Sequence, residues 1–457
     1  MKIVIVFCAV LFASVCSAQN LQPFKQLRYD EDYSFLKDDS TTTWYDRLKF
    51  RPINSTRSIY LSIGGDVRYQ YLYFKNEDWG DMPEDDDGFT LTRWLTHVDL
   101  HIHSRFRVFT ELQSAFANSR IPAAPPIEEN PLDLHQAFVD WNTVKSPNLH
   151  ITIRAGRQEI MFGSQRLVSV RDAPNARQSF DGIRMMIDQH QNHLNIFYAN
   201  YVKGKSGIFD DSSNGDHRFY GAYFSRSRVP LLRNMDAYYV GFENTNAMLD
   251  DGGGDERRHT FGMRVWDMQR AWKYDLEGIY QTGTLDQKSI SAWSVSLISS
   301  YMFSQTRLKP EIGVKTELIS GNKKYTDNKT ETVNPLFPQG AYFGLAAKIG
   351  PANLMDIHPA ISIVTKSNVR LSMDYAAIWR YSLNDGIYRG NMSMIYSGQQ
   401  GTSRYIGGQL SGTVIYPANK FILLICGFSW FDAQAYLKEA GTGEDIWFGF
   451  TSAQLKF

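Results

Sequence analysis

Hydrophobic and polar residues alternate one by one along several long segments of the chain. Between Trp94 and Val108, apolar side chains fall on one parity, while histidine, aspartate and arginine fall on the other. The segments 61–73 and 307–318 repeat this pattern. Alternation over about ten to fifteen residues exceeds the usual length of a soluble strand and fits a strand tilted across a membrane. A charged inner face and an apolar outer face are typical of a transmembrane β-barrel.

The alternation predicts an all-β fold, an antiparallel up-and-down barrel of about eighteen strands, with sixteen as the alternative. Strands are expected near 60–74, 91–104, 105–118, 133–142, 149–159, 180–189, 193–202, 217–227, 234–244, 257–268, 272–282, 290–302, 306–319, 355–366, 369–381, 404–415, 418–431 and 444–457. Connectors after odd-numbered strands are predicted to be long, as at 75–90, 119–132, 160–179, 320–354 and 382–403, and the others tight. Long outer loops and short periplasmic turns give this asymmetry, which predicts that both termini are periplasmic.

The two ends of the chain predict export to the outer membrane. Lys2, the apolar run Ile3 to Val15 and the small residues before Gln19 predict a signal peptide over residues 1–18. Residues 19–59 lack clear alternation and are expected to form a periplasmic lead-in, followed by the barrel over 60–457. The final strand closes on an aromatic residue, which predicts recognition by the barrel-insertion machinery and residence among outer-membrane lipids.

Composition narrows the partners further. The 48 lysines and arginines balance the 48 acidic residues, so there is no basic excess of the kind that nucleic-acid binding requires. Any charge selectivity must therefore arise from local placement. Aromatic residues make up 14% of the chain, which suits membrane-interface belts. After removal of the signal peptide Cys426 is the one remaining cysteine, so no internal disulfide is expected.

The segment 153–184 carries the most distinctive charges. Its arginines are Arg154, Arg157, Arg166, Arg171, Arg177 and Arg184, and its acids are Glu159, Asp172 and Asp181. Guanidinium groups stay charged and present forked donors that match carboxylates, so on a lumen wall they would attract a polyanion. The alternative is that they satisfy polar neighbours on a loop folded into the barrel. Alternation turns Arg154 and Arg184 inward, and a bend at Gly156 is expected to turn Arg157 inward as well.

Spaced motifs in two stretches of the chain resemble the alginate export family of outer-membrane porins. The first stretch has GRQE at 156–159, GS at 163–164, RL at 166–167, RDAPN at 171–175 and SFDGIR at 179–184; the second has NPLFP at 334–338, YFG at 342–344 and GPANLMDIHP at 350–359. The resemblance implies an eighteen-stranded barrel whose arginine-rich constriction is formed partly by inward-folded loops, and it implies no catalysis. Carried over to this chain, it makes the six arginines the candidates for the solute path, with Glu159 and Asp181 as their internal partners.

These observations predict a passive, anion-selective channel for an anionic polysaccharide, an oligosaccharide or a related small solute. No cofactor or metal is expected, and periplasmic export partners are a further expectation. The alternatives are a barrel enzyme acting on lipid or glycan, and an adhesive or scaffolding barrel. The sequence contains no G-x-S-x-G, HExxH or phosphate-loop motif to favour the enzyme, and an adhesive barrel would not need clustered arginines. No motif identifies the solute or the direction of transport.

Two patterns could suggest a metal site. His97, His101 and His103 share one strand parity. Asp99 and Arg105 lie on the same parity, so the histidines are predicted to be ordinary residues of a polar lumen face. The acidic run 84–87 lacks the ligand spacing and the glycine of an EF-hand loop, so a solvated loop is favoured there.

Overall fold

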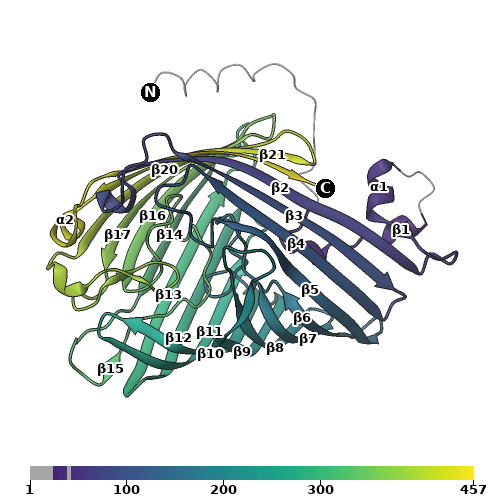
Figure 1. Cartoon of the computed structure of the whole chain (residues 1–457), viewed down its shortest axis with the longest axis horizontal. Helices are drawn as coiled ribbons and strands as arrows, with labels where there is room; N and C mark the ends of the chain where they lie inside the picture. The colour runs from purple at the N-terminus through teal and green to yellow at the C-terminus, as the bar shows by residue number, and fades with distance from the viewer. Residues whose placement is uncertain (1–23, 39–42) are drawn as a thin grey trace.

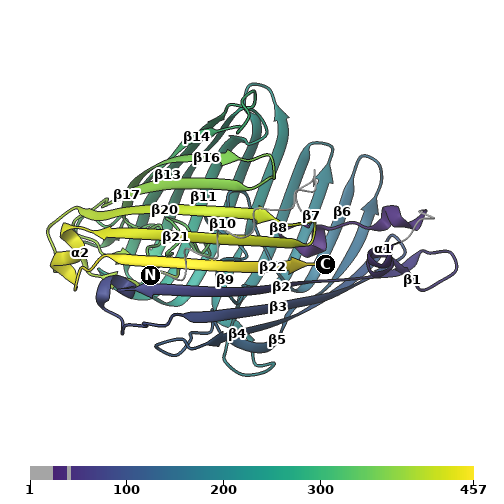
Figure 2. The same ribbon diagram turned by 90° about the horizontal axis from the view of Figure 1, so that it is seen from above.

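The computed structural model describes residues 24–38 and 43–457, and the predicted signal peptide lies outside the described residues. Eighteen consecutive strands pair antiparallel, each with its neighbours, to form a single curved wall (Figure 1). The first of them, β2, also pairs with the last, β22, and this contact closes the barrel (Figure 2). The prediction of eighteen strands is therefore confirmed over the alternative of sixteen.

The strand boundaries follow the predicted segments closely. The barrel strands are β2 (Ile59–Lys75), β3 (Phe89–Ile102), β4 (Phe106–Asn118), β5 (Asn130–Lys145), β6 (His150–Gln158), β7 (Phe180–Gln189), β8 (Asn192–Lys203), β9 (Ser212–Val229), β10 (Arg233–Leu249), β11 (Gly252–Asp267), β12 (Trp272–Leu285), β13 (Lys288–Met302), β14 (Glu311–Ile319), β16 (Leu354–Val364), β17 (Arg370–Arg380), β20 (Tyr405–Pro417), β21 (Ile422–Ala433) and β22 (Ile446–Lys456).

Short elements supplement this wall. The short strands are β1 (Arg51–Pro52), β15 (Lys329–Thr330), β18 (Ile387–Tyr388) and β19 (Met394–Tyr396). The helical elements are η1 (Arg28–Asp30), η2 (Ser34–Lys37), α1 (Trp44–Lys49), η3 (Glu77–Gly80), η4 (Gly398–Gln400) and α2 (Ala435–Ala440). In the described part of the chain, no helix has both the length and the apolar character needed to cross a membrane.

Alternation along each strand separates the two faces of the wall. In β11, Arg258 and Arg264 are buried toward the lumen, whereas Phe261 and Met263 on the opposite face are 49% and 60% exposed. The exposed apolar face suits the hydrocarbon of a membrane, and the charged face suits a wet interior. Because side chains alternate with period two, a slip of one residue in β11 would turn Arg258 and Arg264 into lipid, so the two faces fix the register.

The connectors segregate by length to the two ends of the barrel, with corrections to the predicted pattern. Two connectors that the pattern predicts to be long, 250–251 and 286–287, contain two residues each. The glycines at 252–254 still pair with β10, so the β10–β11 hairpin continues to its tip instead of opening into a loop. At the other end, β14 begins at Glu311, after Pro310, so Arg307 and Lys309 lie in the preceding connector rather than in a strand.

Two long connectors fold into the lumen and fill much of it. The β6–β7 connector (159–179) and the β14–β16 connector (320–353) meet in a parallel bridge between Val168 and Phe337. Phe337 packs against wall aromatics, including Phe180 and Phe219. At the short-turn end, Tyr29 from the N-terminal segment lies edge-on to wall rings in β4 and β5. The interior is therefore lined by loops and by the N-terminal segment as well as by strands.

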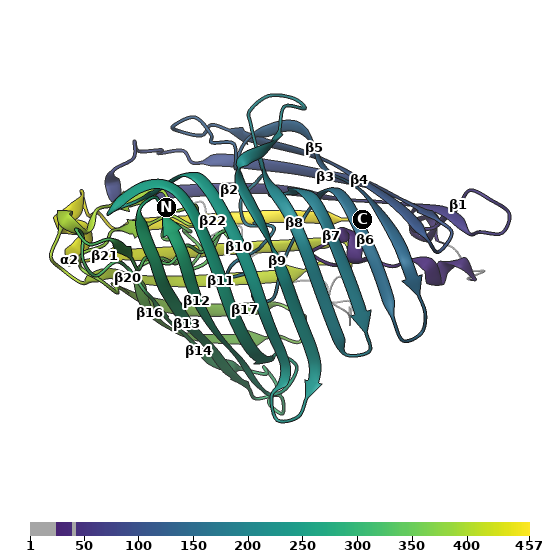
Figure 3. The same ribbon diagram turned by 90° about the horizontal axis from the view of Figure 1, so that it is seen from below.

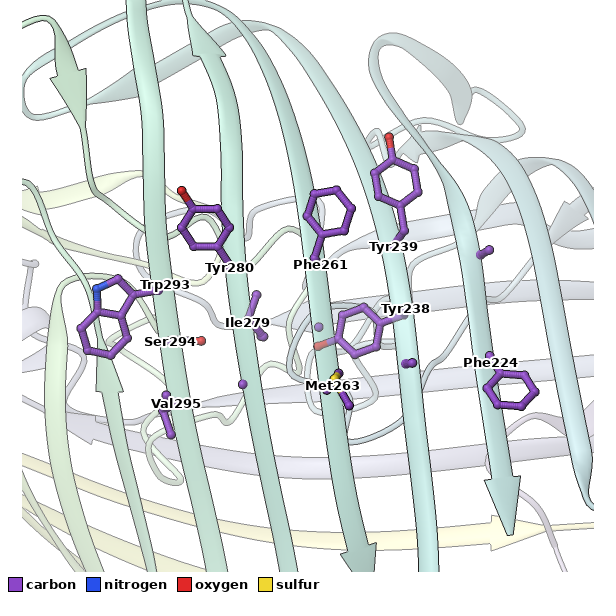
Figure 4. A pocket seen from close by; sticks show the side chains of 14 residues that line it. Phe224, Tyr238, Tyr239, Phe261, Met263, Ile279, Tyr280, Trp293, Ser294 and Val295 are labelled. Carbon is purple, nitrogen blue, oxygen red and sulfur yellow. The ribbon is translucent and has the colours of Figure 1, made fainter. Parts of the chain in front are cut away.

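The outer wall carries a shallow apolar groove of about 770 Å³ across β9 to β13 (Figure 4). Its lining includes small residues such as Ala237 and Gly278. It also includes the larger side chains of Phe261, Met263 and Tyr280. Figure 3 shows these strands side by side in the lower part of the wall. Because its rim residues belong to the outward face, the groove faces lipid and is separate from the charged interior.

Candidate functional site

A row of charged side chains crosses four neighbouring strands on the lumen side of the wall. Arg107 of β4 lies opposite Asp140 of β5, which lies opposite Arg154 of β6, which lies opposite Arg184 of β7. Asp140, Arg154 and Arg184 are buried. The inward orientation predicted for Arg154 and Arg184 is therefore present in the register. We refer to these four residues as the charged row.

The members of the charged row differ in how their charges are balanced. Arg107 makes a bidentate pair with Asp99, with both N–O distances 2.7 Å. Arg154 makes a bidentate pair with Asp140 at 2.7 and 2.8 Å. Arg184 instead donates to the neutral amide oxygen of Asn195, at 3.1 and 2.8 Å. Across the described residues no carboxylate forms an ion pair with Arg184, so the row and its direct partners carry one excess positive charge.

Two guanidinium nitrogens of the row are buried without an acceptor. They are Nη1 of Arg154 and Nη1 of Arg184, neither of which has a hydrogen-bond partner among the described residues. The rings of Tyr29 and Phe138 lie 4.0 and 3.8 Å from the Arg154 guanidinium carbon and stabilise its charge. A buried donor that lacks an acceptor costs about 1–3 kcal/mol, and a carboxylate oxygen is the acceptor that guanidinium groups bind best.

The arginines of the inward connector are held by acids of the wall. Arg166 reaches Glu277 at 2.7 Å, Glu317 at 3.1 Å and Asp275 at 3.3 Å, so one guanidinium ties the connector to β12 and β14. Arg177 pairs with Glu159 at 2.7 Å, as the sequence predicts for that acid. Such paired, buried guanidinium groups anchor the connector. For Arg166 and Arg177, this agrees with the alternative that arginines satisfy polar neighbours on a loop folded into the barrel.

Asp172 and Arg171 hold the middle of the same connector in different ways. Asp172 pairs with Arg93 at 2.8 Å, and Arg68 donates to its backbone carbonyl at 2.6 Å. Burial favours a raised pKa for Asp172, but the guanidinium groups of Arg93, Arg177 and Arg68 outweigh it and hold the pKa well below its usual range. Arg171 donates from Nε only to a backbone carbonyl, that of Pro338, at 3.4 Å, and burial lowers its pKa.

Arg157 and Asp181 lie away from the charged row. They are cross-strand partners in β6 and β7 and form an ion pair at 2.8 Å, so Asp181 is an arginine partner as predicted. The register gives Arg157 the same parity as Ala155, which is exposed, and does not support the expected inward turn at Gly156. Arg157 instead donates at the strand end to the carbonyls of Leu134 and Asp211.

The three histidines considered for metal binding do not converge. His97 faces Glu111 at 3.5 Å, His101 faces Asp99 at 3.1 Å, and His103 lies in the following turn with a φ of 54°. Each of the first two is therefore part of a separate wall pair.

Several lumen residues of the site were not singled out from the sequence. They are Arg68, Arg93, Arg107 and Asp140. The alternation that places Arg68 and Arg107 on the polar parity is the signal that could have identified them. Asp140 stands on the polar parity of β5 between the outward residues Val139 and Trp141, which are 46% and 49% exposed.

The family model for alginate export matches residues 59–445, which is most of the chain and includes the charged row. The chain belongs to the alginate export family. Among curated proteins, no sequence matches this member of the family.

Solved outer-membrane porins share the fold of this alginate export family member. Pseudomonas aeruginosa OccD3 (OpdP) aligns with a TM-score of 0.59 and 10% identity, covering 90% of this chain and 93% of the other. Acinetobacter baumannii OccAB1 gives 0.57 and 11%, with 90% and 100% covered. Pseudomonas aeruginosa OccK2 (OpdF), solved in complex with glucuronate, gives 0.55 and 9%, with 87% and 98% covered. The family and this fold support an outer-membrane channel.

Proposed function

We propose that this channel passes anionic solutes, with uronate-containing saccharides as the favoured class, by passive diffusion. The observation that carries the proposal is the charged row, where Arg184 has an amide rather than an acid as its partner. Within the described residues, the buried Nη1 groups of Arg154 and Arg184 have no acceptor. A carboxylate entering the lumen would be attracted by the positive charge that the row leaves unbalanced. The glucuronate bound to OccK2 is a carboxylate of this kind, on a barrel of the same fold.

Local charge can set selectivity although the whole chain is neutral. A narrow lumen with walls of low dielectric constant concentrates the field of a few positioned charges. A passing anion would meet the charge of Arg184, while the charges of Arg166 and Arg177 are cancelled by their acids. Weak, multi-point attraction lets the solute enter and also leave, as conduction requires.

The same proposal includes the orientation of the chain. Residue 59, where β2 begins, and the C-terminal Phe457 lie at the short-turn end, beside α1 and β1 (Figure 1). Short turns face the periplasm in bacterial barrels, so we place both termini and the lead-in over 19–59 there. The N-terminal segment would then narrow the periplasmic mouth through Tyr29.

Planar bilayer recordings test this function. With a KCl gradient across the bilayer, the reversal potential is expected to have the sign of an anion-preferring pore. Glucuronate and short oligouronates are expected to interrupt the current more often than neutral oligosaccharides of equal length. A cation-preferring reversal potential, or equal interruption by neutral sugars, would contradict the proposal. Chemical conversion of any sugar would instead support the enzyme alternative.

A further inference from the structure

Three aspartates from two separate segments converge at the long-loop end of the barrel. Asp133 belongs to β5, and Asp210 and Asp211 end the β8–β9 connector (204–211). One carboxylate oxygen from each lies within 4.8 Å of the other two. A hydrogen bond of 2.9 Å from the Phe209 amide to the Leu132 carbonyl holds the connector beside β5. We refer to Asp133, Asp210 and Asp211 as the rim carboxylates.

The negative charge of the rim carboxylates is not balanced by the protein. In the described part of the chain, Arg157 is the one cation within ion-pair distance, with Nη1 3.8 Å from Asp133 Oδ1. That guanidinium is already paired with Asp181 at 2.8 Å. A further positive charge is therefore needed at this place.

A second feature of this place is a pair of buried oxygen atoms that no donor of the described residues satisfies. Asn130 is fully buried, and its Nδ2 donates to Asp211 Oδ2 at 2.8 Å, so its amide reaches the cluster. The amide oxygen of Asn130 and Oδ1 of Asp210 are both buried and have no hydrogen-bond partner among the described residues. Buried oxygens without donors are unfavourable unless something else, such as a metal ion, coordinates them.

We propose that Asp133, Asp210 and Asp211, with the amide oxygen of Asn130, bind one calcium ion. The ligand set contains only oxygen, which selects hard cations over zinc or copper. Calcium takes about six to eight oxygens in irregular geometry, so three carboxylates, one amide and two or more waters complete its shell. Magnesium requires near-octahedral geometry, which ligands from two separate backbone segments do not readily supply.

Two other acidic groups of the described residues differ from the rim carboxylates in their surroundings. Glu111, His135 and Glu159 also lie close together, but Arg177 already pairs with Glu159 at 2.7 Å and supplies the positive charge. In the acidic run 84–87 considered in the sequence, Asp85 accepts a hydrogen bond from the Gly88 amide. Asp86 and Asp87 are exposed. The rim carboxylates are therefore the group whose charge and unsatisfied oxygens both require a cation.

Calcium at this place would fasten the β8–β9 connector to β5. Between these elements lie β6, which ends at Gln158, and β7, which begins at Phe180. The connector between these two strands turns into the lumen. The β8–β9 connector crosses the rim beside this gap, with Ile208 bridged to Leu132. A bound ion would thus fix the rim of the barrel next to the inward connector.

Calcium binding can be measured on protein refolded into detergent free of lipopolysaccharide, which itself binds divalent cations, and stripped with a chelator. Titration calorimetry with calcium chloride is expected to show one site. Calcium is also expected to slow cleavage by trypsin after two exposed lysines, Lys203 at the end of β8 and Lys205 in the connector. Absence of saturable binding in the folded protein, or unchanged cleavage at both lysines, would overturn the proposal.

Matched variants locate the site. Asp210→Asn removes one ligand charge without removing a protein ion pair and is expected to weaken calcium binding about ten-fold or more. Asp211→Asn is expected to do the same, and heat-modifiable migration on gels verifies that each variant is folded. Asp86→Asn/Asp87→Asn removes two exposed acids from another loop and should leave binding unchanged. Equal affinity in folded Asp210→Asn, folded Asp211→Asn and wild type would place the ion elsewhere and refute the site.

Discussion

Arg166 and Arg184 lie close together in sequence, and both face the lumen, yet their surroundings differ in kind. Arg166, on the inward connector, is surrounded by three acids of the wall. Arg184, at the end of the charged row, has the amide of Asn195 as its partner and one buried nitrogen without an acceptor. An arginine whose charge is cancelled anchors the fold, whereas an arginine whose charge remains can act on a solute. The number of arginines in a segment therefore does not measure its attraction for anions.

The largest expected effect comes from removing the charge of Arg166, which anchors the inward connector. Arg166→Gln leaves Asp275, Glu277 and Glu317 buried without their cation, which is expected to lower the free energy of unfolding by about 3–5 kcal/mol. The inward connector should then loosen and the single-channel conductance should rise. Urea unfolding in lipid vesicles and bilayer recordings measure the two effects.

The matched control for this change is Arg270→Gln. Arg270 is 60% exposed and lies 3.6 Å from Asp267, so its loss should change stability by about 0–1 kcal/mol. If Arg166→Gln unfolds at the same urea concentration as Arg270→Gln, the three acids do not depend on Arg166 and the anchoring role is wrong.

A smaller effect is expected from making Arg184 resemble Arg166. Asn195→Asp replaces the amide with a carboxylate of the same shape and supplies the missing counter-charge. A unit negative charge about 5 Å from a passing ion in water raises the free energy of an anion by about 0.8 kcal/mol and lowers that of a cation by about as much, so the anion-over-cation permeability ratio should fall about fifteen-fold. Asn419→Asp, in a short turn, is the control that adds the same charge outside the row. An equal effect of both variants on the ratio would mean that overall charge, not the row, sets selectivity.

The smallest expected effect is that of pH on the ion pair between Asp172 and Arg93. The pKa of Asp172 is held below its usual range in the folded protein. Its ion pair with Arg93 therefore stabilises the connector fully at any pH above the unfolded-state pKa of about 3.9. That stabilisation is lost only as the pH falls through the lower folded-state pKa. Asp172→Asn removes the pair at every pH. The conductance difference between wild type and Asp172→Asn should therefore be the same at pH 7 and pH 5. A difference that shrinks by pH 5 would show that Asp172 is protonated in that range.

The wall of the barrel was predictable because alternation is a local property. The positions of β2 to β22 and the inward orientation of Arg154 and Arg184 follow from parity alone. The partners were not predictable, because Arg166 finds Glu317 across 151 positions of the chain. The bridge between Val168 and Phe337, where the two connectors meet, likewise joins residues far apart in the sequence. Sequence thus identified which charges enter the lumen, and tertiary pairing determined which of them remain uncancelled.

The proposed anion preference depends on the uncancelled charge of Arg184. Reversal potentials of matched variants test this dependence directly. The reversal potential in a KCl gradient near 0.1 M is compared among wild type, Arg184→Gln and Arg105→Gln, the last an exposed arginine in a short turn. Arg184→Gln should lose most of the anion preference and Arg105→Gln should keep it, and the difference should shrink at 1 M salt, where the Debye length is about 3 Å. If folded Arg184→Gln gives the wild-type potential at low salt, the charged row does not select anions.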